Sequence, residues 1–550
     1  MYLLRISLTF IENGGDIINT EQENKSKLEP WVFFPPLIFV AAFVFWIFQS
    51  TPKNVASSLK FAFNLVTDKM GGTLEIYVFF LFLLCFYFAF GPYAKKKLGD
   101  EKPEFSTLSW LGMIFTSTAG LGVLTWTSIE FFYYIQTPPF GLKPMSTETY
   151  SWALAYPMFH WGFTAWAMNT IFGLVFAYFF FVKKKDAVRP STACETLIGS
   201  KLSKGWLGKL IDALFVIGFV GGVTTCIGVN VPTVVGLLTK VLGVNESLSS
   251  DAVLILSWSV FMAILLYTGL KKGIRYLSDI RVYFGFGILA VILLLGPTSY
   301  IINTFTDTLG QLLQNFVRMS LYTDPHFKSG MPQSWTIWYW AWYLALVLQC
   351  GIFLGRISKG RTVREYVIGS LAAATAGSWI FFAVFSNFSM HVFTQGTVPI
   401  ADIMAKYGQG RAIVEIWTQL PLGGFMMAIL LVYGYISMQT LLNGATYTLS
   451  MVTTKELSGE EEPPKWSRIF WSIVLGVIAI ALAYVGGISS AQTTTIIGAL
   501  PMFFITILIL ISFFKDIRRT WGKSSATQSS ISRDMEKPRA MDQSTISMDN

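Results

Sequence analysis

The stretch that decides the fold is Ser334–Gly355, which reads SWTIWYWAWYLALVLQCGIFLG. It contains no charged residue, and as a helix it is long enough to cross the hydrocarbon core of a bilayer. Four tryptophans stand within its first nine positions. Because Trp335, Trp338 and Trp342 are spaced i, i+3 and i+7, they share one face of a helix. The stretch therefore predicts a membrane-spanning helix with one face lined by indole rings.

Indole faces inside a membrane favour a methylated ammonium ion. Such an ion cannot donate hydrogen bonds, but each aromatic face attracts it by roughly 0.5–2 kcal/mol. Tryptophan also serves in interfacial belts and in ordinary helix packing, and for any single Trp of this stretch these are the commoner explanations. The cluster as a whole favours a binding site for a cation.

The composition is that of a membrane protein. Of the 550 residues, 53% are hydrophobic and only 13% are charged, whereas a soluble domain carries roughly 25% charged residues. The net charge is +9, but Lys and Arg occur in short clusters between apolar runs. That pattern orients membrane helices, and no recognition motif accompanies it, so nucleic-acid binding is not expected.

The apolar runs predict an all-α polytopic membrane protein with roughly twelve transmembrane helices. The run at 151–182 is long for one crossing, so we expect it to tilt or bend. The runs are 32–50, 72–92, 108–134, 151–182, 208–240, 252–270, 279–303, 335–355, 366–390, 418–450, 467–488 and 492–514.

Basic clusters follow the even-numbered runs, whereas odd-numbered connections such as 244–251 and 486–492 contain no Lys or Arg. The positive-inside bias then places both termini in the cytoplasm. Residues 1–30 are predicted to be a cytoplasmic N-terminal tail, and residues 521–550 a disordered cytoplasmic C-terminal tail. The clusters are Lys95–Lys97, Lys183–Lys185 with Arg189, Lys271–Lys272 with Arg275, Arg356–Arg364, Lys455 with Lys465 and Arg468, and Lys515–Lys523.

Two external segments look amphipathic rather than membrane-spanning. Residues 304–322 are predicted to place Leu309, Leu312, Leu313 and Phe316 on one helix face, and residues 410–419 form a shorter relative. The alternatives are surface helices that couple two halves of the molecule, or ordinary long loops.

Polar and ionisable residues inside apolar runs are costly and so mark candidate sites. Ser, Thr and Gly crowd Thr116–Gly122, where a helix can either unwind or pack closely against a neighbour. For Glu130 we favour a neighbouring donor or helix terminus over direct substrate contact. His160 has no further ligand at metal spacing and is interpreted as a hydrogen-bonded structural residue. Arg281 is either functional or an interfacial arginine that snorkels.

Catalytic chemistry finds no support in the sequence. It contains no GxSxG, HExxH or Walker motif and only 3 His. The cysteines Cys85, Cys194, Cys226 and Cys350 form no CxxC pair, so neither a disulfide nor a zinc site is expected. We predict no catalytic residue, metal or cofactor. A channel would need a filter-like repeat, and the sequence contains none. The remaining class of protein is a secondary transporter.

Residues 334–343, SWTIWYWAWY, resemble the signature of the betaine/choline/carnitine transporter (BCCT) family, which ends in two tryptophans where this chain has Tyr343. The resemblance extends over roughly residues 30–520 and includes FHWGFTAWAM, YTDPHF, GRISKGRTVRE and IEFFYYIQTPPFG. It is strongest to the L-carnitine/γ-butyrobetaine antiporter branch. It implies a transporter domain at 31–520 in the cytoplasmic membrane, often assembled as a homotrimer. The implied fold has two leading helices and two LeuT-like inverted five-helix repeats, here about 108–303 and 335–514.

The resemblance also implies site residues. In the family an aromatic box holds the quaternary ammonium group, and the matching positions are Tyr133, Trp161, Trp166 and Trp342. Periodicity alone does not pair Trp161 with Trp166, since five residues on a regular helix are separated by about 140°. Trp335 matches a position linked to an outer, regulatory substrate site.

The resemblance also bears on ion coupling and on substrate specificity. The antiporter branch fills one cation site with a fixed arginine, and Arg281 matches it. Sodium-coupled members present adjacent Thr and Ser where this chain has Ser437–Met438, which weakens an oxygen-lined sodium site. Cys350 replaces a methionine near the substrate carboxylate, which leaves a shorter or different betaine open as the substrate.

The expected function is therefore sodium-independent exchange of L-carnitine and γ-butyrobetaine or related betaines. The alternative within transport is sodium-coupled uptake of glycine betaine or choline-type osmolytes. A membrane-embedded betaine sensor would need an output module, and a betaine-modifying enzyme would need a catalytic set. The sequence indicates neither.

Overall fold

The computed structural model describes residues 28–118, 120–185, 189–267, 271–455, 462–485 and 488–535. Ten helices in this part are long and apolar enough to cross a membrane. Two bent helix pairs pass the same test when each is taken as one span, which gives up to 12 candidate spans. The described residues form no strand beyond isolated bridges. The predicted all-α polytopic fold is confirmed.

The first two long helices are α2 (Pro30–Gln49) and α3 (Pro52–Phe90). The sequence places the start of α3 near residue 72, which is wrong. The hydroxyl of Thr51 accepts a hydrogen bond from the backbone N–H of Asn54, and Pro52 has the fixed φ that suits the first helical position. The early turns of α3 include Lys and Ser, so an apolar scan does not detect them.

The next two spans are broken. Helices α4 (Thr107–Ser117) and α5 (Leu121–Gln136) form a pair bent by 55°, which agrees with unwinding in the Ser/Thr/Gly-rich segment. Close packing occurs there too, because a Cβ on Gly377 of the later span 363–394 would lie 2.5 Å from the backbone oxygen of Phe115. Helices α6 (Thr149–His160) and α7 (Phe163–Ala177) separate at Trp161 and Gly162, and the π-helix η1 (Tyr178–Val182) follows. This interruption lies within one candidate span, Thr149–Val182, and the predicted tilt or bend stays a prediction.

The middle of the chain ends in a sharp corner. Helices α13 and α14 are bent by 108° at Gly296 and Pro297. The sequence predicts one helix over the apolar run at 279–303, and this prediction is wrong. Proline has no N–H to continue the helical bonds, which fixes the corner. The elements here are α8 (Pro190–Ala193), α9 (Glu195–Ile198), α10 (Ser200–Lys204), α11 (Trp206–Leu242), α12 (Leu248–Tyr267), α13 (Lys271–Leu295) and α14 (Thr298–Ser320).

Helix α14 is the predicted amphipathic helix, but its buried face differs from the predicted one. Ile301, Leu312 and Met319 are buried, whereas Leu313 is 57% exposed. The buried positions follow a spacing of about 3.6 residues, and Leu313 lies about 100° away from Leu312. Placing Leu313 on the buried face is therefore wrong.

The second half contains the tryptophan-rich span and the last helices. The predicted short helix at 410–419 is confirmed as α19. Helix α22 continues as far as Met535, so the predicted boundary at residue 521 does not mark its end; residues 523–535 contain neither Pro nor Gly. The elements are η2 (Gln333–Ile337), α15 (Trp338–Arg356), α16 (Val363–Phe381), η3 (Phe382–Ser386), α17 (Asn387–Thr394), α18 (Ile400–Tyr407), α19 (Gln409–Trp417), α20 (Gly423–Thr453), α21 (Lys465–Val485) and α22 (Ile488–Met535).

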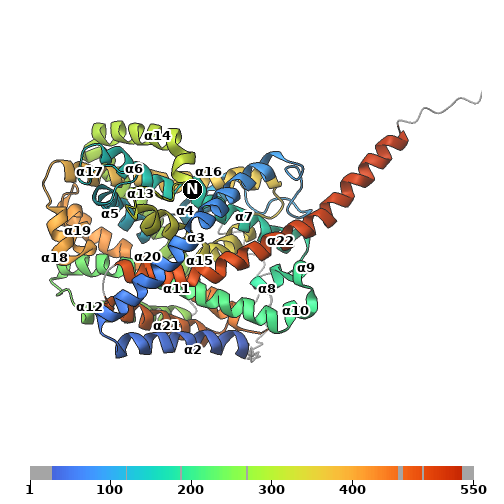
Figure 1. Ribbon diagram of the computed structural model, residues 1–550, viewed down its shortest axis with the longest axis horizontal. Helices are drawn as coiled ribbons and strands as arrows, with labels where there is room; N and C mark the ends of the chain where they lie inside the picture. The colour runs from blue at the N-terminus through green and yellow to red at the C-terminus, as the bar shows by residue number, and fades with distance from the viewer. Residues whose placement is uncertain are drawn as a thin grey trace, which may run out of the picture.

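Helix α15 lies in the middle of the bundle, where it contacts α3, α7, α11 and α22 (Figure 1). Glycines allow this close packing. A Cβ atom on Gly355 would lie 2.9 Å from the backbone nitrogen of Ala177, and one on Gly222 of α11 would lie 2.8 Å from the Cβ of Ala345. The tryptophan-rich helix is thus held by neighbours whose backbones approach it directly.

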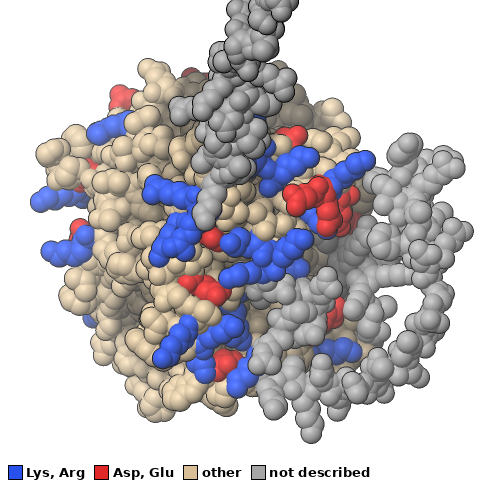
Figure 2. All heavy atoms as spheres, turned by 90° about the vertical axis from the view of Figure 1, so that its right-hand side faces the viewer, with Lys and Arg blue, Asp and Glu red and all other residues tan. Residues whose placement is uncertain are grey.

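One end of the bundle carries many basic side chains. Helices α18 and α19 lie at the left end in Figure 1, and α8 to α10 lie at the right end, where α22 leaves the body. Figure 2 faces this right end and shows Lys and Arg side chains gathered across it. The predicted N-terminal tail falls almost wholly outside the described residues, and the orientation of the termini stays a prediction.

Candidate functional site

The indole face predicted for the tryptophan-rich span exists. Trp338 and Trp342 stack with ring centroids 5.2 Å apart, and Trp335 meets Trp338 edge-on at 5.8 Å. Trp126 of α5 packs edge-on against all three, at 5.7 Å from Trp335, 5.6 Å from Trp338 and 6.5 Å from Trp342. The broken first span and the tryptophan-rich span therefore meet through their indoles.

The break between α6 and α7 brings two more predicted tryptophans to this face. Trp161 meets Trp342 edge-on at 6.3 Å, and both Trp161 and Trp166 contact the ring of Tyr343, at 5.8 and 6.3 Å. The indole N–H of Trp166 donates to the backbone oxygen of Trp161 at 3.1 Å and to the hydroxyl of Ser378 at 3.0 Å. On a regular helix Trp161 and Trp166 would point about 140° apart, but the helix is interrupted at Gly162, so this separation does not apply.

Tyr133 lies in a second group of rings. Its ring packs 4.8 Å from that of Trp335, and its hydroxyl donates to Gln409 of α19 at 2.8 Å. Gln409 in turn donates to the backbone oxygen of Val229 on α11 at 3.2 Å. The structure thus brings Trp161 into contact with Trp342 and Tyr343, and Trp166 into contact with Tyr343. Tyr133 instead packs against Trp335 and is hydrogen-bonded to α19.

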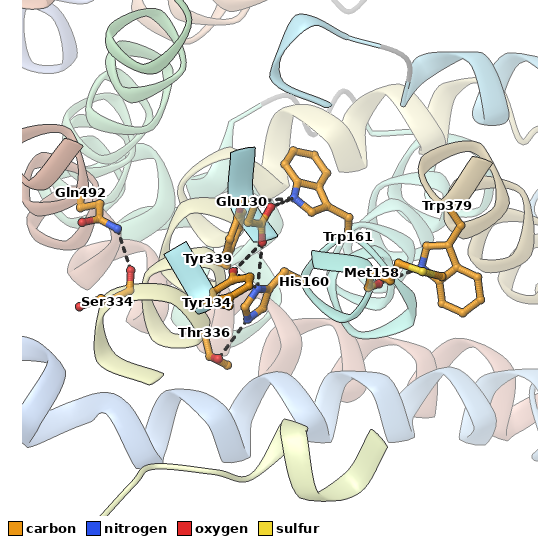
Figure 3. A network of polar contacts seen from close by, with 10 residues as sticks. All are labelled: Glu130, Tyr134, Met158, His160, Trp161, Ser334, Thr336, Tyr339, Trp379 and Gln492. Atoms are coloured by element: carbon orange, nitrogen blue, oxygen red, sulfur yellow. Dashed lines mark hydrogen bonds and ion pairs between the residues drawn. The ribbon is translucent and has the colours of Figure 1, made fainter. Parts of the chain in front are cut away.

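A buried polar network lies directly beside these rings (Figure 3). Glu130 of α5 is completely buried. Its Oε1 accepts from the hydroxyl of Tyr134 at 2.6 Å, and its Oε2 accepts from the hydroxyl of Tyr339 at 2.8 Å and from the indole N–H of Trp161 at 3.3 Å. The prediction that Glu130 meets neighbouring donors is confirmed. The carboxylate fixes one predicted box residue, Trp161, from behind.

His160 is part of the same network. Its Nδ1 lies 2.8 Å from the hydroxyl of Tyr134 and 3.3 Å from Glu130, and its Nε2 lies 3.0 Å from the hydroxyl of Thr336. Both ring nitrogens therefore have partners, as the interpretation of His160 as a structural residue requires. The network connects α5, α6 and the π-helix η2 that precedes α15.

Two further contacts in Figure 3 stabilise irregular backbone. The indole N–H of Trp379 donates to the backbone oxygen of Met158 at 2.8 Å, at the end of α6. Gln492 of α22 donates to the backbone oxygen of Ser334 at 2.7 Å, in the π-helical turn. Carbonyls released by helix irregularities must find partners when water is excluded, and these side chains supply them.

Arg281 lies on α13 and is only 9% exposed. An arginine that snorkels would extend its guanidinium to the surface, so the buried position disfavours that interpretation. Its Nε has no hydrogen-bond partner among the described residues, and the phenol of Tyr433 on α20 is close enough to interact electrostatically. One turn from Tyr433, the buried hydroxyl of Ser437 also has no partner in the described part of the chain.

Cys350 is partly exposed and lies two turns after Tyr343 on α15. The thiols of Cys350 and Cys226 are close enough to each other to interact electrostatically. Cys226 donates weakly to the backbone oxygen of Gly222 at 3.4 Å, and the indole N–H of Trp342 donates to the same oxygen at 3.1 Å. Cys350 therefore shares a helix face with Tyr343, whose ring joins the tryptophan cluster.

The family model for the betaine/carnitine/choline family transporters (BCCT) matches residues 31–522. The chain belongs to this family. It is accordingly a multi-span membrane transporter of small molecules, in a family of transporters and not of enzymes. A solved structure of a Na⁺-coupled sialic acid symporter, in a substrate-bound outward-open state, is similar over 74% of this chain and 87% of that chain, with 13% identity and a TM-score of 0.40.

The sequence prediction misses two residues that the BCCT transporter places among its central aromatic rings, Tyr339 and Tyr343. Tyr339 contacts Trp342 at 6.0 Å and Trp161 at 5.9 Å. The signal was present in the sequence, because 339 and 343 follow 335 at steps of four and so lie beside the indole stripe.

Proposed function

We propose that this BCCT transporter exchanges quaternary-ammonium carboxylates, most specifically L-carnitine and γ-butyrobetaine, without sodium. The observation that carries the proposal is the run of ring contacts in which Trp161 meets both Trp342 and Tyr343, and Trp166 meets the same Tyr343. Aromatic faces attract a methylated ammonium ion that cannot be hydrogen-bonded. Each substrate is a zwitterion at neutral pH, so a one-for-one exchange moves no net charge and needs no ion gradient.

Arg281 supports the absence of sodium coupling. A buried guanidinium holds a fixed positive charge between α13 and α20, and no described acidic side chain forms an ion pair with it. A sodium ion 4 Å from this group would be repelled by about 4 kcal/mol at an effective dielectric constant of 20. The arginine thus takes the role of a cation that sodium-coupled relatives would have to bind.

Sodium-coupled uptake of glycine betaine or a choline-type osmolyte is the second candidate. The buried hydroxyl of Ser437, without a partner in the described residues, is the kind of oxygen that a sodium site uses. Cys350 in place of a longer side chain suits a shorter betaine. Because of these two observations, the experiment below also tests for sodium-coupled uptake.

The test is counterflow in proteoliposomes. Vesicles loaded with γ-butyrobetaine receive labelled L-carnitine outside, in sodium or in potassium. We expect uptake that requires the internal betaine and ignores sodium. Uptake that requires a sodium gradient, or that occurs only with glycine betaine, would replace exchange with sodium-coupled uptake.

The variant Arg281→Ala tests the cation role. We expect transport to fall at least tenfold and sodium to restore part of it, because the vacated space can then hold an ion. Arg468→Ala is the matched control: Arg468 is also buried, but it is hydrogen-bonded to Asn443. Sodium should restore nothing there. Full sodium-independent transport by Arg281→Ala would contradict the role.

The setting of the transporter is proposed on separate grounds. We place it in the cytoplasmic membrane with both termini in the cytoplasm, supported by the basic side chains at the end where α22 leaves the body (Figure 2). A homotrimer is proposed from the family resemblance alone. Cysteine labelling from each side of the membrane tests the orientation, and native mass measurement tests the trimer.

A further inference from the structure

Tyr343 stands between two of the tryptophans on which the proposed function rests. Its ring meets Trp161 edge-on at 5.8 Å and 74°, and Trp166 at 6.3 Å and 71°. Tyr343 is half-buried, yet its hydroxyl oxygen is inaccessible and has no hydrogen-bond partner among the described residues. A buried hydroxyl without a partner is unfavourable, and beside a candidate binding site it can be satisfied by donating to a ligand.

The neighbouring tyrosines show what is different about Tyr343. The hydroxyls of Tyr134 and Tyr339 donate to the carboxylate of Glu130, at 2.6 and 2.8 Å. Tyr339 is one turn before Tyr343 on α15 and faces the same cluster. Two of these three phenols are therefore committed to the protein, and the third remains available as a donor.

The surroundings of the Tyr343 hydroxyl offer little competition. Cys350 shares a face of α15 with Tyr343, and the carboxylate of Glu130 accepts from Tyr339, whose ring lies 6.5 Å from that of Tyr343. Thiols are weak hydrogen-bonding groups, and the Glu130 oxygens already accept bonds from Tyr134, Tyr339 and Trp161. A ligand that brings its own anionic oxygen would find a strong donor here.

We propose that the hydroxyl of Tyr343 donates a hydrogen bond to the carboxylate of the bound betaine and selects carboxylated substrates. This inference rests on the proposed function and deepens it. The trimethylammonium group can accept no hydrogen bond and takes the indole faces, so the carboxylate is the group that needs a donor. Choline carries the same cation without a carboxylate and gains nothing from a charge-assisted bond.

The experiment compares two ligands on one pair of variants. Binding of γ-butyrobetaine and of choline is measured by titration calorimetry on the purified full chain and on Tyr343→Phe. We expect the Kd for γ-butyrobetaine to rise roughly 10- to 100-fold, the effect of losing a hydrogen bond to a charged group. The Kd for choline should change by less than about threefold, because the aromatic ring is retained.

Tyr77→Phe is the matched control. Tyr77 is a buried tyrosine of α3 that packs against Phe503 of α22, and it makes no ring contact with the tryptophan cluster in the described part of the chain. Removing its hydroxyl should change neither Kd. If Tyr343→Phe does not yield folded protein, Tyr343→Trp, which keeps an aromatic ring but moves the donor, should show the same selective loss.

The other outcomes separate the inference from the proposed function. Equal weakening of both ligands would mean that Tyr343 acts only through ring packing, and unchanged binding would mean that its hydroxyl has no role; either result overturns the inference alone. Binding of choline without γ-butyrobetaine by the wild-type chain, or binding of neither ligand, would overturn the proposed exchange of betaine carboxylates as well.

Discussion

Replacing Glu130 separates the charge of its carboxylate from its hydrogen-bond pattern. In Glu130→Gln the amide oxygen must take the Oε2 position, because Trp161 and Tyr339 both donate there and an indole N–H cannot accept. The amide nitrogen then faces the Tyr134 oxygen and Nδ1 of His160, which can both accept when Nε2 of His160 donates to its own partner. Glutamine therefore satisfies the whole network without charge.

The expected magnitudes follow from this pattern. A hydrogen bond to a charged acceptor contributes about 1.5–3 kcal/mol and a neutral one about 0.5–1.5 kcal/mol. In Glu130→Gln the bond from Tyr339 goes to a neutral oxygen, and the bond with Tyr134 reverses and also becomes neutral, so we expect a loss of about 2 kcal/mol. Glu130→Leu removes both bonds altogether and should cost about 3–6 kcal/mol. It also leaves the hydroxyl of Tyr339 without an acceptor in the described residues.

Glu75 provides a matched control for the same assay. It is a buried carboxyl group on α3, and neither of its oxygens has a hydrogen-bond partner in the described part of the chain. Exchanging an unpartnered buried carboxyl group for an apolar side chain relieves a desolvation cost. Glu75→Leu should therefore leave stability unchanged or raise it, although the substitution is chemically identical to Glu130→Leu.

The assay is thermal unfolding in detergent, followed by the fluorescence of the 18 tryptophans and compared at one scan rate. Betaine titration of the folded variants reports whether Trp161 keeps its position. The expected order of apparent melting temperature is Glu75→Leu at or above wild type, then Glu130→Gln, then Glu130→Leu. Glutamine as damaging as leucine would refute the hydrogen-bond assignment, and leucine without effect would refute the network as a source of stability.

Two further predictions concern the loop that contains Asp324 and the packing of α15. Burial alone would raise the pKa of Asp324, but the hydrogen bonds from Ser329 and Tyr322 lower this pKa below the ordinary value. The carboxylate therefore stabilises the fold above about pH 4, and this stabilisation is lost as the pH falls further. The melting-temperature difference between wild type and Asp324→Asn should hold from pH 7 to 5 and shrink towards pH 3; a constant difference would contradict it. A Cβ on Gly351 would lie 3.0 Å from the backbone of α7, so Gly351→Leu should abolish monodisperse protein in gel filtration, whereas Gly310→Ala, which meets nothing within 4 Å, should be neutral or stabilising.

The helices and the indole face could be predicted because each depends on local sequence. An apolar run of sufficient length predicts a span, and the spacing of Trp335, Trp338 and Trp342 predicts their shared face. The misplaced features have equally local reasons. The first turns of α3 are polar but capped by Thr51, and the orientation of Leu313 depends on a phase that a few residues of pattern do not fix.

The polar network behind the tryptophans depends instead on contacts between distant parts of the chain. Tyr134 is four residues from Glu130, so this bond follows from helix geometry once a helix is assumed. Tyr339 is 209 residues from Glu130 and His160 is 176 from Thr336, and no periodicity connects them. Only the break at Trp161, which turns one indole toward Glu130, places these groups together. Trp161 at the same break also contacts Tyr343, so the surroundings of that tyrosine depend on irregular backbone far away in the sequence. For this reason the proposed contact between Tyr343 and the substrate is a property of the fold. A comparison of sequences would show only that position 343 holds a tyrosine where the family signature has a tryptophan.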